Sequence, residues 1–258
     1  MRVVLFCGGL GMRLRDHFER TPKPLVEIGL RPILWHLMSY YAHFGHKDFV
    51  LCLGHGAHAI KEYFLKYDEC VSNDFVLSKG GRSIELLKRD IDDWRITFVD
   101  TGLQASIGQR LRAVQKHLEG EETFLANYAD GLANLDLDAY VDYFRKRGKI
   151  GCFLSVAAPH SFHLVNADSD HHVRKLEAVG RSVVRINGGF FVFRREIFDY
   201  IRDGEDLVLE PFDRLIAGQQ LLAYPFDGFW RNMDTFKDKQ ELEEMLLSGD
   251  TPWQVWKH

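Results

Sequence analysis

Cysteine is scarce in this sequence, and long apolar runs are missing. The 258 residues include only four cysteines. None forms a Cys-x-x-Cys pair, and no group of cysteine and histidine has the spacing of a zinc site. We therefore expect reduced thiols and a cytoplasmic location. No segment approaches the roughly 18 apolar residues of a membrane span, and the apolar run at the start is too short for a signal peptide, so no membrane partner is expected.

Net charge is also small. The chain has 33 basic and 37 acidic side chains, a formal charge of −4. That balance argues against a surface for nucleic acid, but it is compatible with a local basic pocket for a small phosphate ligand. An apolar fraction of 46% excludes a disordered chain. With only seven prolines and no linker-like stretch, residues 1–258 are expected to form one domain.

Strand-like and helix-like segments alternate over the first 150 residues. The apolar stretch 2–7 predicts a strand buried on both faces. Pro32 then opens a helical pattern that Gly45 closes. Further strands are predicted at 48–53, 95–100 and 123–128, and further helices at 57–67 and 107–118. This rhythm predicts a parallel sheet with helices on both faces. For the whole chain we expect an α/β fold with a Rossmann-like mixed, mostly parallel sheet.

The pattern becomes richer in strands after residue 150. Strands are predicted at 151–157, 162–166, 172–177, 189–193 and 220–225, and helices at 194–202, 209–217 and 236–248. We expect this half, about 151–258, to extend the same sheet as the half formed by about 1–150. Residues 68–94 are irregular, and they predict either a lid or contact surface or a solvated loop.

A glycine-rich stretch follows the first strand directly. In Gly8-Gly9-Leu10-Gly11-Met12-Arg13, the glycines let the backbone approach a ligand, and successive amides can bind phosphate oxygens. Arg13 adds a cation suited to phosphate. Lys23 lies between two prolines that stiffen the backbone around it. A tight turn is the alternative interpretation, and the spacing fits neither a Walker loop nor G-x-G-x-x-G.

Together these motifs carry a resemblance to a known family. Residues 8–14, followed by Thr-Pro-Lys-Pro-Leu-Val-Glu-Ile-Gly at 21–29, resemble the sugar-1-phosphate nucleotidyltransferases. The glucose-1-phosphate cytidylyltransferase branch is similar in six further stretches, at 31–36, 60–64, 94–102, 108–111, 187–191 and 228–235.

This resemblance implies a reaction and its partners. CTP would react with a phosphorylated acceptor of the sugar-1-phosphate type and release pyrophosphate, with Mg²⁺ as the cofactor. The acceptor phosphate is already ionised, so catalysis would rest on positioning and charge neutralisation. The resemblance also implies a homo-oligomer and a role in making precursors of surface polysaccharide. The first half would bind nucleotide, and the second would bind acceptor.

The resemblance assigns roles to particular residues. Those implied for catalysis are Arg13 and Lys23, and those implied for Mg²⁺ are Asp130 and Asp234. Nucleotide contacts are implied for Phe6, Gly8, Gly9, Gly11, Met12, Thr101, Gly102, Arg110 and Asp130. Acceptor contacts are implied for Asn187, Gly188, Glu210 and Trp230.

Simpler interpretations exist for three of these side chains. Asp130 would serve a turn ahead of Gly131. Asp234 would cap the predicted helix at 236–248. Arg110 would be a surface residue of the predicted helix at 107–118.

The acceptor half departs from the family pattern. Val179 stands where the family has the lysine that holds the acceptor phosphate, and His163 replaces a loop glycine. The candidates for a replacement cation are Arg174, Lys175, Arg181 and Arg185.

Three alternative functions follow. One is the same transfer with UTP or dTTP, or to a non-glucose or non-sugar phosphate. Another is a non-catalytic, nucleotide-sensing regulatory subunit. The third, a nicotinamide-binding enzyme, lacks its glycine motif.

Overall fold

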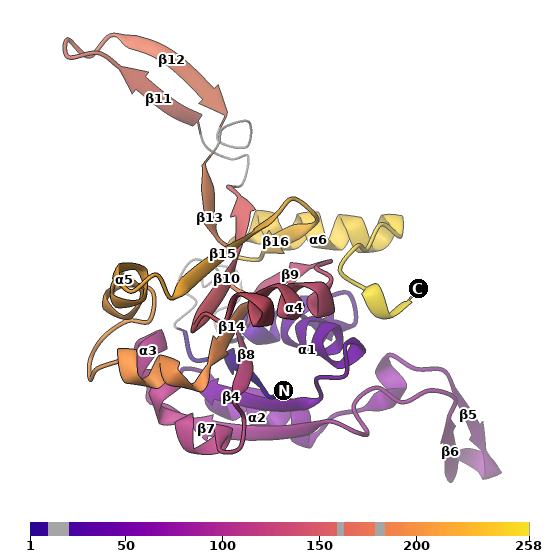
Figure 1. Ribbon diagram of the computed structural model, residues 1–258. Helices are drawn as coiled ribbons and strands as arrows, with labels where there is room; N and C mark the ends of the chain where they lie inside the picture. Colours follow the sequence, from indigo (N-terminus) through magenta and orange to yellow (C-terminus); the bar gives the residue numbers. More distant parts are fainter. Residues whose placement is uncertain (10–20, 159–162, 179–183, 258) are drawn as a thin grey trace.

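A single eight-stranded sheet forms the centre of the computed structural model, which describes residues 1–9, 21–158, 163–178 and 184–257 (Figure 1). Its strands run in the order β13-β10-β14-β8-β1-β4-β7, and β15 pairs with β10. Their bounds are β1 Val3–Phe6, β4 Asp48–Leu53, β7 Arg95–Asp100, β8 Thr123–Tyr128, β10 Gly151–Ala157, β13 Arg185–Asn187, β14 Phe191–Arg194 and β15 Leu221–Phe226. Strands from both halves of the sequence therefore belong to one sheet.

The sheet is mixed. Strands β8, β1, β4 and β7 pair in parallel, as β10 and β15 do. Strand β14 runs antiparallel to both β8 and β10, and β13 runs antiparallel to β10. The predicted α/β fold is confirmed. The carboxyl ends of β8, β1, β4 and β7 meet at one edge, where open α/β sheets bind their ligands.

Helices cover both faces of the sheet. Their bounds are α1 Ile33–His43, α2 Ala57–Leu65, α3 Ile107–Ala113, α4 Leu137–Arg147, α5 Glu210–Ala217 and α6 Phe236–Ser248. In β1, Val3 and Leu5 join the buried cluster under α1 and α4, whereas Val4 and Phe6 join the cluster under α3 and α5. Alternate residues of a strand face opposite sides, so this strand must be apolar throughout.

Among the described residues, four two-stranded ribbons complete the fold. They are β2 Glu27–Ile28 with β3 Arg31–Pro32, β5 Phe75–Ser78 with β6 Ser83–Leu86, β9 Gly131–Ala133 with β16 Trp230–Asn232, and β11 His163–Ala167 with β12 Val173–Ala178. Figure 1 shows β5–β6 and β11–β12 as two arms that project from the body in different directions. The β9–β16 ribbon instead lies against the body, where it positions acidic residues.

Several predicted elements need correction. The predicted helix at 107–118 ends at Ala113 and continues as a short 3₁₀ turn, Gln115–Leu118. The predicted helix at 194–202 is a 3₁₀ helix, Arg195–Tyr200. The irregular stretch 68–94 contains the β5–β6 arm. Within the described part of the chain, every helix is too short or too polar to span a bilayer.

Helix α4 was not predicted from the sequence. Asp136 caps its start by accepting a hydrogen bond from the Ala139 amide, and Gly148 ends it in the left-handed conformation. Its buried residues, Leu137, Tyr140, Val141 and Phe144, follow helical spacing. A start signal, a stop signal and the apolar period were therefore all present in the sequence.

Candidate active site

Two aspartates far apart in the sequence meet because of the β9–β16 ribbon. Asp130 directly precedes β9, and Asp234 follows β16 after one intervening residue. The antiparallel register pairs Asn232 with Gly131, and the Met233 amide donates to the Asp130 carbonyl at 2.9 Å. The ribbon therefore fixes both carboxylates at one place, beyond the carboxyl end of β8.

Lys23 lies between these two carboxylates. Its Nζ donates to Asp130 Oδ2 and to Asp234 Oδ1, each at 2.5 Å. Pro22 and Pro24 flank it in the short 3₁₀ helix Lys23–Leu25, and Pro22 packs against Gly56. Burial alone would lower the pKa of Lys23, but the charges and hydrogen bonds of the two aspartates outweigh it and raise the pKa above its ordinary value. The result is a fixed, charged ammonium in an acidic site.

The same carboxylates suit a magnesium ion. Both oxygens lie within 2.5 Å of one point, the Lys23 nitrogen, so they converge on a common space. Their side chains are 25% and 32% exposed, which leaves them accessible to a ligand. Mg²⁺ prefers hard oxygens and is commonly held by one or two carboxylates plus substrate phosphates. The residues present therefore fit the predicted ion.

Asn232 is a residue of this site that sequence reasoning did not single out. Its amide nitrogen donates to Asp234 Oδ2 at 2.5 Å, which orients the carboxylate toward Lys23. The alternative of Asp234 as a helix cap is wrong, because Thr235 caps α6 with its own side chain. The signal for Asn232 was its position two residues before an acidic candidate on a strand.

Arg110 lies at the carboxyl ends of β1, β4 and β7. It is only 3% exposed, so the surface interpretation is wrong. Its guanidinium donates to the Gly8 and Leu53 carbonyls and to the Thr101 hydroxyl, at 3.0, 3.1 and 2.7 Å. The Thr101 hydroxyl donates in turn to the Leu53 carbonyl at 2.7 Å. The predicted nucleotide residues Gly8, Thr101 and Arg110 thus form one hydrogen-bonded group with Leu53, which was not predicted.

The glycine-rich stretch is described only at its start. A Cβ on Gly8 would lie 2.1 Å from Arg110 Nη1, whereas a Cβ on Gly9 would meet no atom of the described residues within 4 Å. Gly8 therefore makes room for a protein side chain, whereas Gly9 is exposed. The predicted residues Gly11, Met12 and Arg13 lie outside the described residues.

The remaining nucleotide candidates lie at the same edge. Phe6 is 6% exposed, with its ring 6.3 Å from that of Tyr128, so only its backbone could serve a base. Gly102 follows Thr101 with φ of +95°, a conformation that glycine adopts without strain. Its amide donates to Asp100 Oδ1 at 3.0 Å. The loop after β7 is therefore fixed by its own contacts.

The acceptor candidates divide into two groups. Asn187 ends β13, and its Oδ1 accepts from the Gly189 amide at 2.9 Å, while a Cβ on Gly189 would lie 3.2 Å from the Tyr128 ring. Trp230 is buried, and its indole nitrogen donates to the Gly188 carbonyl at 2.9 Å. These three predicted residues therefore lie together near β8. Glu210 is exposed at the start of α5, whose main contacts are with β15 and Arg195–Tyr200.

Three of the four candidate replacement cations are already paired. Arg174 contacts Asp168 at 2.6 Å, and Lys175 contacts Glu177 at 2.5 Å. Arg185 contacts Asp227 at 2.8 Å and also donates to the Ser155 and Phe226 carbonyls. Val179 and Arg181 lie outside the described residues, and His163 is exposed at the start of β11.

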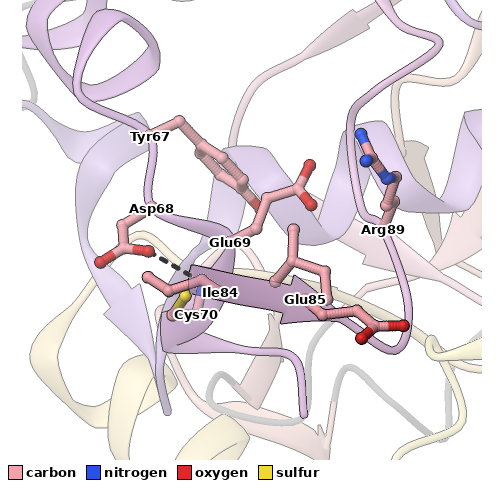
Figure 2. A pocket seen from close by; sticks show the side chains of 8 residues that line it. Tyr67, Asp68, Glu69, Cys70, Ile84, Glu85 and Arg89 are labelled. Carbon is pink, nitrogen blue, oxygen red and sulfur yellow. Dashed lines mark hydrogen bonds between the residues drawn. The ribbon is translucent and has the colours of Figure 1, made fainter. Parts of the chain in front are cut away.

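A cavity of about 580 Å³ lies at the base of the β5–β6 arm (Figure 2). Asp68, Glu69, Glu85 and Arg89 line it together with apolar side chains, and Asp68 accepts a hydrogen bond from the Cys70 amide. None of the predicted site residues that the structure describes lines this cavity. We therefore place the candidate site at the strand edge around Lys23.

Comparison with known proteins identifies the family of this chain. The family model for nucleotidyl transferase matches residues 2–248. A glucose-1-phosphate cytidylyltransferase of Salmonella typhi is 36% identical over 258 residues, covering 100% of both chains. A mannose-1-phosphate guanyltransferase of Saccharomyces cerevisiae is 25% identical, covering 92% of this chain and 62% of that protein. A solved structure of UDP-glucose pyrophosphorylase with UDP-glucose has a TM-score of 0.68 at 12% identity, covering 96% and 98%.

The solved structure supports the fold, and the sequence relatives support the kind of chemistry. A match over nearly the whole chain, with 36% identity to a full-length relative, exceeds what a shared fold alone requires. The predicted resemblance is confirmed, and so is the expectation of an enzyme rather than a nucleotide-sensing subunit. The chain belongs to the nucleotidyl transferase family.

Proposed function

We propose that this enzyme transfers the cytidylyl group of CTP to a sugar 1-phosphate and releases pyrophosphate. The observation that carries the proposal is Lys23, held between Asp130 and Asp234 at the carboxyl edge of the sheet. A fixed ammonium beside two carboxylates is a site for polyphosphate and its metal ion. The choice of CTP is supported by the relative from Salmonella typhi, a glucose-1-phosphate cytidylyltransferase.

In the proposed reaction an acceptor phosphate oxygen attacks the α-phosphorus of CTP, and the bond to the pyrophosphate oxygen breaks. A phosphate needs no general base at neutral pH, so the protein contributes position and charge. Lys23 stabilises the negative charge that grows around the α-phosphate. Asp130 and Asp234 would hold Mg²⁺, which neutralises phosphate charge when bound. Arg13, Gly11 and Met12, with the open backbone at Gly9, are proposed to bind the outgoing pyrophosphate.

The acceptor is proposed to lie beside Asn187, Gly188 and Tyr128. Trp230 would shape this pocket indirectly, because its indole holds the Gly188 carbonyl. Glu210 remains a proposed contact from its exposed position on α5. Val179 replaces the family's lysine, so a phosphate there would lose a charge-assisted contact. That loss would lower kcat/KM for the acceptor by about 10- to 100-fold. We expect the preferred acceptor to reflect this loss.

Pyrophosphate release tests the proposal directly. The enzyme, with Mg²⁺, would be offered CTP, UTP, dTTP, ATP and GTP in turn, each with α-D-glucose 1-phosphate. We expect turnover with CTP to exceed that with every other nucleotide. A preference for UTP or dTTP would refute the cytidylyl assignment, and no release with any nucleotide and any phosphorylated sugar or polyol would refute the transferase.

Three finer proposals follow from the same family. Mg²⁺ is the cofactor, which EDTA inhibition reversed by Mg²⁺ would support. The product supplies surface polysaccharide synthesis in the cytoplasm. The enzyme is a homo-oligomer, which sedimentation equilibrium would check.

A further inference from the structure

The four terminal N–H groups of Arg110 are all used by oxygen atoms of the protein itself. Nη1 donates to the Leu53 carbonyl at 3.1 Å and the Thr101 hydroxyl at 2.7 Å. Nη2 donates to the Gly8 carbonyl at 3.0 Å and the Leu103 carbonyl at 3.4 Å. A guanidinium has two hydrogens on each terminal nitrogen, so neither nitrogen has one left for a phosphate or a base.

The four acceptors come from three neighbouring strand ends. Gly8 follows β1, Leu53 is the last residue of β4, and Thr101 and Leu103 follow β7. Backbone bonds already cross these ends, because the His55 amide donates to the Gly8 carbonyl at 3.4 Å and the Thr101 amide to the Leu53 carbonyl at 2.9 Å. Arg110 completes this junction from α3. A single planar group thereby sets the spacing of three loops at the ligand-binding edge.

The surrounding glycines fit the arginine closely. A Cβ on Gly8 would lie 2.1 Å from Nη1, and a Cβ on Gly54 would lie 2.7 Å from the same atom. Real Cβ atoms do not approach other atoms so closely. Helix α3 is itself held in place, since a Cβ on Gly108 would lie 2.6 Å from the Glu205 carbonyl. Both the helix and the loops are therefore shaped around the guanidinium.

We propose that Arg110 is a positioning residue that fixes the three strand ends before nucleotide binds, rather than a residue that contacts the nucleotide. This inference rests on the proposed function for its effect on nucleotide, but the junction itself exists in the free protein. A lysine cannot replace it, because one ammonium nitrogen with three hydrogens cannot reach four acceptors spread over three loops. The role depends on the planar fork of the guanidinium.

Hydrogen exchange in the nucleotide-free enzyme tests the proposal. Arg110→Lys should speed exchange of the His55 and Thr101 amides at least about tenfold. Initial rates of pyrophosphate release should show a higher KM for the nucleotide, by about 10- to 100-fold, because the binding surface is no longer preformed. Arg112→Ala is the matched control. It removes another arginine of α3. Among the described ion pairs, Arg112 contacts only the exposed Asp203, so its loss should change neither measurement.

The outcomes separate the two ideas. Unchanged amide exchange with a raised KM would overturn the proposal, because a direct nucleotide contact leaves the free protein as it was. No change in either measurement would overturn it as well. Should Arg110→Lys fail to fold, Thr101→Val removes one of the four acceptors and should speed exchange at His55 by a smaller factor, and normal exchange there would refute the junction. The exchange measurement needs no substrate, so it remains valid even if the proposed transfer reaction fails.

Discussion

Replacing Lys23 by methionine should destabilise the enzyme in the absence of divalent metal. The substitution keeps most of the side-chain volume but removes the ammonium that separates two carboxylates. Each carboxylate oxygen lies 2.5 Å from the Lys23 nitrogen, so the two oxygens are at most about 5 Å apart. At an effective dielectric constant of about 20, two like charges at that distance repel by about 3 kcal/mol.

The exposure of the three side chains places the expected loss of unfolding free energy between two limits. Breaking a buried ion pair costs about 3–5 kcal/mol, and breaking an exposed one costs about 0–1 kcal/mol. The Lys23 side chain is 14% exposed, and its two partners are 25% and 32% exposed. We therefore expect a loss of about 2 kcal/mol, which is a fall in melting temperature of about 4–8 °C for a chain of this size.

Thermal unfolding in EDTA and in Mg²⁺ measures this effect. The melting temperature of Lys23→Met should rise with Mg²⁺ by several degrees, because a divalent cation can neutralise the two partly exposed carboxylates. Wild type without nucleotide should respond less, since its own ammonium occupies that space. Lys47→Met is the control, because Lys47 forms an ion pair with Asp93 in which both side chains are largely exposed. Equal melting temperatures of wild type and Lys23→Met in EDTA would refute the reasoning.

Three further predictions concern other parts of the molecule. Asp130→Asn should keep the fold and lower kcat by about 10²–10³, so near-normal turnover with Mg²⁺ would contradict the metal assignment. Gly8→Ala should lower the melting temperature because its Cβ would overlap Arg110, whereas Gly9→Ala should leave it unchanged, and circular dichroism melts compare the two. His36 is buried and its pKa is lowered to about 4, chiefly by desolvation. As pH falls below about 6.5, His36 therefore takes up a proton in the unfolded chain before it does so in the folded protein. The free energy of unfolding should drop by up to about 3 kcal/mol by pH 4. Urea titrations should show a smaller drop for His36→Gln.

Much of the fold follows from local patterns in the sequence. The predicted strands at 48–53, 95–100, 123–128 and 151–157 coincide with β4, β7, β8 and β10, because their apolar residues must be buried. The predicted helix at 236–248 coincides with α6, whose start is fixed by the side chain of Thr235. Such signals are local, since the spacing of apolar residues and the capping side chain are both set by neighbouring residues along the chain.

The sequence by itself also determined the family, because its resemblance runs over nearly the whole chain. Lys23 between two prolines and the glycines after a buried strand predicted phosphate binding, with a tight turn as the alternative. Only the tertiary structure decided that Asp130 and Asp234 face the same ammonium, because their meeting depends on the register of β9 with β16. Only the tertiary structure placed Arg110 beneath the strand ends. An arginine on a short helix reads as a surface residue until the loops that bury it are known, and those loops come from three different strands.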